Sequence, residues 1–166
     1  MSSSPTPPSE NLASRVFRFE ADFAGDLRCL PMAVRRKLDL AGVKLKLVHW
    51  HGLTTEERQR LLAWPDDPAS LAGLRQWLLE HSHSLPQGPA SPLPPAAGRE
   101  WQQADQVPAG LEASCRQLGL VLHPATWRSL NELQRFALVK LSHPGHEHRN
   151  LPRALEEFAP NAAEPD

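Results

Sequence analysis

The sequence predicts an all-α protein, a single helical domain made of two similar helix-turn-helix-type units. Three observations lead to this prediction. Apolar residues recur at helical spacing from residue 31 onward, helix-starting residues precede each run and Gly or Pro follows it, and the same order returns after a proline-rich break. A short extended arm is expected before the first helix.

The N-terminal residues are predicted to form a disordered tail over 1–14, because they are rich in Ser and Pro and carry little apolar surface. Residues 16–23 follow, and their phenylalanines alternate at first as in a short strand or extended arm. Since no partner strand is in view, we expect this arm to pack against helices. Residues 160–166 are predicted to be a second disordered tail, so the folded domain spans 15–159.

The first predicted unit spans residues 31–84 and holds several short helices. Pro31 suits the first turn of one helix. Thr54, with Glu57 three residues later, forms a capping box that starts another. Asp67, followed by a proline, opens the last helix of this unit.

A proline-rich linker, 85–100, is expected to run across the surface between the units. The second unit, 108–158, repeats the order of the first. Pro108 starts a helix, Asn131 caps the next one, and a last helix surrounds Leu155.

A single offset of 77 residues aligns the two units without a gap. It pairs Gly42 with Gly119 and Trp50 with Trp127, and it preserves the helix starts and stops. The other pairs are Pro31 and Pro108, Val34 and Leu111, Leu45 and Leu122, Leu53 and Leu130, Thr54 and Asn131, Arg58 and Arg135, Leu74 and Leu151, and Leu78 and Leu155. This ordered series predicts an internal duplication, with the units packed about a pseudo-two-fold axis on a common core.

Composition excludes some classes of function but does not identify one. The net charge is −1, with 40% hydrophobic and 22% charged residues. Such a balance gives no long-range field toward nucleic acid or an anionic membrane, so neither is an expected partner. No apolar run is long enough to span a bilayer, the start does not resemble a secretory signal, and Cys29 and Cys115 are far apart. We therefore expect a cytoplasmic protein with reduced cysteines.

The histidines raise a metal-binding alternative. An enzyme or regulator could use His143, His146, Glu147 and His148, which lie close together in the sequence. Metal binding needs three or four convergent ligands, and the sequence has no HExxH helix or cysteine pair. We therefore prefer exposed histidines at helix ends, and we predict no metal, no cofactor and no catalytic residue.

A basic cluster raises a DNA-binding alternative. Arg35, Arg36 and Lys37 follow one another, and a helix from Pro31 could present both arginines to solvent and to phosphates. Residues 50–62 also have the look of a helix-turn-helix. Two points argue against this alternative. The overall charge is nearly neutral, and a charged helix face is usually just solvated.

Two long segments resemble the nitrate reductase associated protein family. The first runs from Phe17 to Asp39 and continues through residues 42–45 to Trp50. The second is Leu133 to Ser142, then Pro144-Gly145-His146-Glu147, Asn150, and the apolar residues of the last helix up to Phe158. The resemblance covers about residues 16 to 158 outside the linker.

The resemblance implies an accessory protein needed for the activity or maturation of assimilatory nitrate reductase in cyanobacteria and some other bacteria. That enzyme would carry molybdenum cofactor and an iron–sulfur cluster, while this chain would bind neither. The family offers no catalytic residues. The motif residues are candidates for a partner surface or for internal ion pairs, and the partner-binding set is Arg28, Arg35, Lys37, Lys140, Pro144, Gly145, His146, Glu147 and Asn150.

Overall fold

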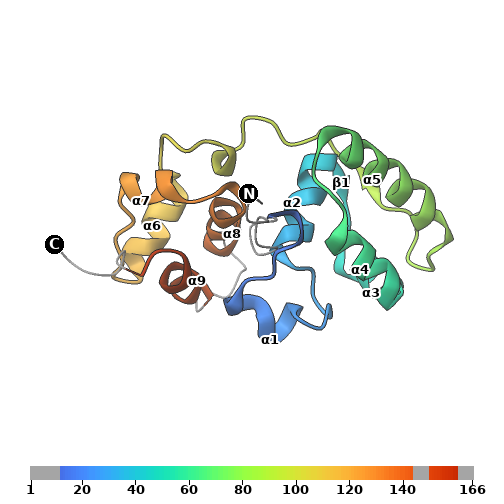
Figure 1. Ribbon diagram of the computed structural model, residues 1–166, viewed down its shortest axis with the longest axis horizontal. Helices are drawn as coiled ribbons and strands as arrows, with labels where there is room; N and C mark the ends of the chain where they lie inside the picture. Colours follow the sequence, from blue (N-terminus) through green and yellow to red (C-terminus); the bar gives the residue numbers. More distant parts are fainter. Residues whose placement is uncertain (1–11, 144–149, 161–166) are drawn as a thin grey trace, which may run out of the picture. The chain divides into compact units, whose positions relative to one another are not determined.

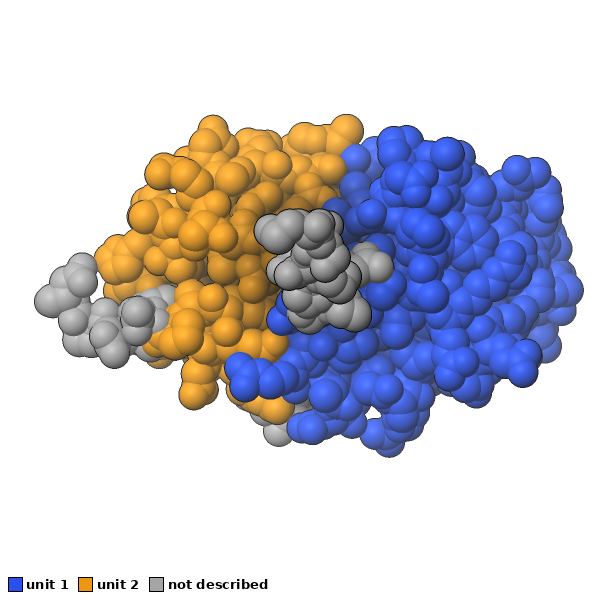
Figure 2. Space-filling model, viewed as in Figure 1, with its two compact units in different colours: residues 1–96 blue, residues 97–166 orange. Residues whose placement is uncertain are grey.

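The computed structural model describes residues 12–143 and 150–160, and these residues are mostly helical (Figure 1). Their contacts divide the chain into two compact units, residues 1–96 and residues 97–166 (Figure 2). The all-α class is confirmed. A single domain over 15–159 with a pseudo-two-fold axis stays a prediction, and each unit is described here by itself.

Unit 1 begins with short helical turns and continues with longer helices. The helices are α1 (Ala21–Ala24), α2 (Met32–Ala41), α3 (Leu47–Gly52), α4 (Thr55–Ala63) and α5 (Pro68–His81), with 3-10 turns at Leu12–Ser14, Arg18–Glu20 and Ser82–Ser84. The predicted capping box is present, because the Glu57 N–H donates to the Thr54 hydroxyl and the Thr54 N–H donates to the Glu57 carboxylate. The Asp67 carboxylate likewise accepts from the Ser70 N–H and starts α5.

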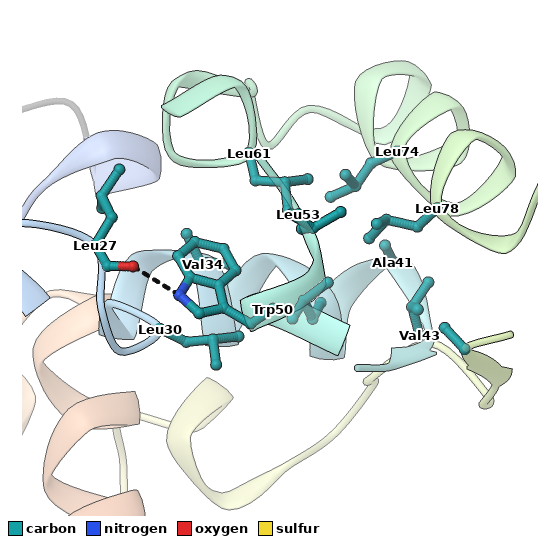
Figure 3. Packing of buried hydrophobic residues seen from close by; sticks show 12 residues of the cluster. Leu27, Leu30, Val34, Ala41, Val43, Trp50, Leu53, Leu61, Leu74 and Leu78 are labelled. Atoms are coloured by element: carbon teal, nitrogen blue, oxygen red, sulfur yellow. Dashed lines mark hydrogen bonds between the residues drawn. The ribbon is translucent and has the colours of Figure 1, made fainter. Parts of the chain in front are cut away.

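The core of unit 1 lies between α2, α3, α4 and α5 (Figure 3). Trp50 is fully buried at its centre, and its indole nitrogen donates to the Leu27 carbonyl at 2.8 Å. Leu61 from α4 and Leu74 and Leu78 from α5 approach the same core from the other side. Four helices, α2 to α5, and the loop before α2 thus depend on one apolar cluster, and the burial of its side chains drives their association.

The N-terminal arm differs from the prediction. Residues 18–24 form a 3-10 turn and α1, so an extended segment over 16–23 is wrong. Glu20 explains the difference: its buried carboxylate accepts from the Phe17 N–H at 3.0 Å and from the Met32 N–H at 2.9 Å, which closes a turn and caps α2. The tail prediction is also too long, since Leu12–Ser14 is helical and Ala13 is buried.

The proline-rich segment is tied to unit 1 instead of only crossing its surface. Its strand β2 (Ser91–Pro92) pairs antiparallel with β1 (Val43–Lys44). The Leu93 N–H donates to the Gly42 carbonyl, and Ala90 is buried. Proline is tolerated here because this two-stranded ribbon has an open edge on each side.

Unit 2 contains η5 (Glu100–Gln102), α6 (Ala109–Gln117), α7 (Pro124–Ser129), α8 (Glu132–Ser142) and α9 (Asn150–Phe158). Asn131 caps α8 as predicted, and its side chain accepts from the Gln134 N–H at 2.8 Å. Trp127 is fully buried, and Trp101 packs edge-on against Phe136 with ring centroids 5.0 Å apart. Unit 2 therefore has a core of its own, built around α8.

Matching helices in the two units keep the offset that the sequence showed. Helices α3 and α7 begin at residues 47 and 124 and end at residues 52 and 129, 77 positions apart in both cases. Gly42 and Gly119 follow α2 and α6 with φ of +83° and +73°, the left-handed conformation that favours glycine after a helix.

These two glycines provide a matched pair for mutation. Substitution of either glycine by Ala should lower the free energy of unfolding by about 1–2 kcal/mol, because a Cβ is disfavoured at positive φ. A Cβ at Gly42 would also lie 2.4 Å from the Leu93 carbonyl oxygen, whereas a Cβ at Gly119 meets nothing within 4 Å. We expect Gly42→Ala to cost about 1–3 kcal/mol more than Gly119→Ala. Chemical denaturation measures both, and equal losses would contradict the crowding at Gly42.

Candidate functional site

Lys37, one of the predicted partner-binding residues, lies inside unit 1. Its side chain is fully buried, and its ammonium donates to the carbonyls of Leu61, Leu62 and Trp64 at 2.5, 2.7 and 2.9 Å. These carbonyls lie in the last turn and at the C-cap of α4, where helix carbonyls run out of N–H partners, and the Leu61 carbonyl also accepts from the Trp64 N–H at 3.3 Å. Lys37 therefore caps α4 from the neighbouring helix, and its assignment to a partner surface is wrong.

The environment of Lys37 has opposing effects on the protonation of its side chain. Burial lowers the pKa of Lys37 to about 7, and the nearby Asp66 opposes that shift. The three carbonyls also favour the ammonium, because only the charged form has three N–H groups to donate. The position of this side chain is thus fixed by hydrogen bonds that a neutral amine could not fully replace.

The neighbouring arginines are also used within unit 1. Arg36 is buried, and its guanidinium pairs with Asp66 at 2.9 Å, so the expectation that it faces solvent is wrong. Arg35 is half-buried and donates from Nε to the Leu30 carbonyl at 3.2 Å. With Arg36 and Lys37 inside, the basic cluster that suggested DNA contacts does not form a continuous cationic surface.

Arg28 remains exposed and accessible. Its Nε lies 2.8 Å from the Asp26 carboxylate, and both side chains are more than half exposed. The Arg28 carbonyl lies 3.1 Å from His51 Nε2, which connects the loop before α2 to α3. Within the first motif, Arg28 is therefore the predicted contact residue that best suits a partner surface.

The second motif is only partly described. Lys140 is half-buried, with its ammonium 5.3 Å from the centroid of the Phe136 ring. Asn150 is half-buried at the start of α9. The remaining predicted contact residues, Pro144, Gly145, His146 and Glu147, lie outside the described residues.

The metal-binding alternative depends on the same loop. Of its four residues, His143 is described and exposed, while His146, Glu147 and His148 lie outside the described residues. Over residues 12–143 and 150–160, no group of three or more His, Cys, Asp or Glu side chains is placed to hold a metal ion. The described part of the chain thus adds no ligand set to the one considered from sequence.

The two cysteines differ in environment. Cys29 is half-buried beside Arg28, whereas Cys115 is buried in unit 2. Burial, with a smaller effect of Glu112, raises the pKa of Cys115 to about 11. A thiol of this kind is a poor nucleophile near neutral pH, because the thiolate is the reactive species.

Sequence reasoning paired Trp50 with Trp127 and Arg58 with Arg135, but it missed that each Trp contacts its Arg. Arg58 lies over the Trp50 ring at 5.8 Å and donates to the Trp50 carbonyl at 3.0 Å. Arg135 lies 6.0 Å from the Trp127 ring centroid. Its Nε donates to the Trp101 carbonyl at 3.0 Å. The sequence signal for these contacts was the spacing, because in each unit the Trp and the Arg are eight residues apart with a helix N-cap between them.

The exposed apolar side chains do not belong to the predicted partner-binding set. Residues 30–34 and 36–38 are buried, as are 141 and 142. Among the described residues, the large apolar side chains that face solvent are Leu47, Val48, Leu93 and Val121. Three of these four belong to unit 1.

Comparison with known protein families places the chain in one of them. The model of the conserved nitrate reductase-associated protein family matches residues 16–158. The chain belongs to this family. The match spans both motifs, and it includes the residues that make the two Trp–Arg pairs and the Lys37 cap.

Two further comparisons add no relative to the family match. Neither the comparison with curated proteins nor that with solved structures found a significant match. Over the described residues, none of the helices is both long and apolar enough to cross a membrane.

Replacement of Lys37 tests its structural role in this family member. Lys37→Met should lower the free energy of unfolding by about 2–4 kcal/mol, because it removes the ammonium donor from three buried or half-buried carbonyls. Lys44→Met, at an exposed lysine of the same unit, is the control and should change stability by less than about 0.5 kcal/mol. Similar effects of the two substitutions would show that the Lys37 hydrogen bonds contribute little.

Thiol labelling tests the difference between the cysteines. With Ellman's reagent near pH 8, we expect one fast-reacting thiol, Cys29, and one slow thiol, Cys115, which is buried and almost entirely protonated. Cys29→Ser should remove the fast phase. If Cys115→Ser removes it instead, the burial of Cys115 is contradicted.

Proposed function

We propose that this protein is a non-catalytic accessory factor that binds assimilatory nitrate reductase and supports its activity or maturation. The family match over residues 16–158 carries the proposal, since the family is described by its association with that enzyme. Under this proposal the reductase carries the cofactors of the reaction and acts with this protein in the cytoplasm. The step assisted is assembly, cofactor loading or electron delivery.

The structure narrows the proposed contact residues. Lys37 is removed from the set because its ammonium is buried under α4. Arg28 is the exposed candidate of the first motif, while Arg35, Lys140 and Asn150 are half-buried candidates. The loop residues Pro144, Gly145, His146 and Glu147 remain candidates on the strength of the sequence alone.

We also infer that the two units arose by internal duplication. Support comes from the common offset of α3 and α7, from the two left-handed glycines, and from the two Trp–Arg pairs. Unrelated helical segments have no reason to agree at a buried tryptophan, a helix cap and an arginine over the ring.

Affinity purification from cells grown on nitrate tests the proposed function. Tagged protein should retain nitrate reductase activity in the eluate, well above a control with the tag alone. Removal of the gene should lower reductase activity in the same cells. A folded, soluble bait that retains no reductase, together with unchanged reductase activity after gene removal, would overturn the proposal.

A further inference from the structure

Helix α3 begins with two apolar side chains that face solvent. Leu47 is 47% exposed and Val48 is 51% exposed, whereas Trp50 in the same short helix is fully buried. The preceding Lys46 and Lys44 are exposed as well. Apolar side chains at this level of exposure gain little from folding, so their presence calls for another explanation.

Unit 2 shows that the fold does not need them. Helix α7 has the same length as α3, starts 77 positions later and buries its tryptophan equally well. Its first two residues are Pro124 and Ala125, which correspond to Leu47 and Val48. Since a helix of the same design forms without large apolar side chains at these positions, Leu47 and Val48 are available for binding.

The β ribbon adds a third apolar group near the lysines. In the antiparallel pair, Lys44 lies opposite Ser91, and the Leu93 N–H bonds to the Gly42 carbonyl. Leu93 directly follows β2 and is two residues from Ser91, so alternation continued by one residue puts Leu93 on the face of the ribbon that carries Lys44. Leu93 is 39% exposed.

The charge on the two contributing segments has one sign. Residues 40–53 and residues 81–99 contain no Asp or Glu, although the whole chain has 19 acidic and 18 basic residues. The segments carry Lys44 and Lys46 next to the exposed apolar side chains. Such a surface complements an acidic partner and repels a basic one.

We propose that Lys44, Lys46, Leu47, Val48 and Leu93, here called the α3 patch, bind an acidic surface segment of nitrate reductase that also presents an apolar side chain. This assignment rests on the proposed function and names its contact surface. The lysines speed and orient the encounter, and the apolar groups lose their contact with water in the complex. None of the residues of the α3 patch belongs to the partner-binding set predicted from the family resemblance.

Binding of purified reductase to two double variants tests the assignment. Lys44→Glu/Lys46→Glu should weaken binding at least about tenfold, and raising the salt from about 0.05 to about 0.3 M should weaken wild-type binding more than binding of this variant. Leu47→Ser/Val48→Ser should weaken it about tenfold with an unchanged salt dependence. Circular dichroism and unfolding midpoints establish that each variant is folded.

Unit 2 supplies matched controls. Val121 is exposed to 50%, like Val48, so Val121→Ser removes an equally exposed valine that is not a member of the α3 patch. Arg128→Glu reverses an exposed cation on α7. Both controls should bind the reductase as the wild type does.

The outcomes separate this assignment from the function on which it rests. If the wild type binds and the folded α3-patch variants bind equally well, the assignment is wrong and the proposed function stands. If the wild type does not bind purified reductase, the assignment is overturned, and the proposed function is overturned with it when gene removal also leaves reductase activity unchanged. If the variants lose binding only to vesicles containing phosphatidylserine and keep the reductase, the patch contacts a membrane and the assignment is again wrong.

Discussion

Each unit is organised by a buried tryptophan whose indole N–H must find an acceptor away from water. An unpaired buried donor costs about 1–3 kcal/mol, so the surrounding chain is constrained to supply a carbonyl. In unit 1 the Leu27 carbonyl accepts from Trp50, and in unit 2 the Gln103 carbonyl accepts from Trp127. The loop before each helical pair is therefore held against the core at one point.

The arginine over each ring extends this constraint to the next helix. Arg58 donates to the carbonyls of Trp50, His51 and Leu27, while Arg135 donates to those of Trp101 and Leu130. A planar guanidinium can donate in several directions while its face packs on an aromatic ring. Loop, short helix and capped helix are thus joined by one side chain, which explains why the junction of α3 and α4 resembles that of α7 and α8.

Buried charges hold α2 in a similar way, one at its start and one from the middle of the helix. Glu20 accepts from the Met32 N–H at its start, and Lys37 donates to the last carbonyls of α4. These contacts account for much of the charged content of the first family motif. Within this motif, Arg35, Arg36 and Lys37 therefore help to hold helices in place, whereas Arg18 and Arg28 are exposed.

The predictions succeeded where the determining contact is local. Thr54 and Glu57, and the cap at Asn131, involve groups three residues apart, so the sequence shows both partners at once. The burial of Lys37 could not be predicted in this way, because its acceptors are 24 to 27 residues away and become neighbours only after α2 and α4 pack. A lysine within a charged run otherwise suggests a solvated face.

Longer-range partners explain the other errors. The alternation of phenylalanines near residue 17 suggested a strand, but the Glu20 carboxylate satisfies backbone N–H groups that a strand would have left for a neighbour. The proline-rich segment looked unable to pair, yet Val43 lies opposite Pro92 in a ribbon with open edges. For the functional residues, the sequence drew attention to charge, whereas the exposed apolar side chains stand out only once burial is known.

Two units of the same design also separate what the fold requires from what it permits. Both units keep the buried tryptophan, the left-handed glycine and the arginine, so these features are needed to join loop, short helix and capped helix. They differ in the side chains at the start of α3 and α7, which are Leu47 and Val48 in one unit and Pro124 and Ala125 in the other. The stability of each unit depends on these shared features. Differences at exposed positions change the core of neither unit, and for this reason they are where a single binding surface can arise on a repeated framework.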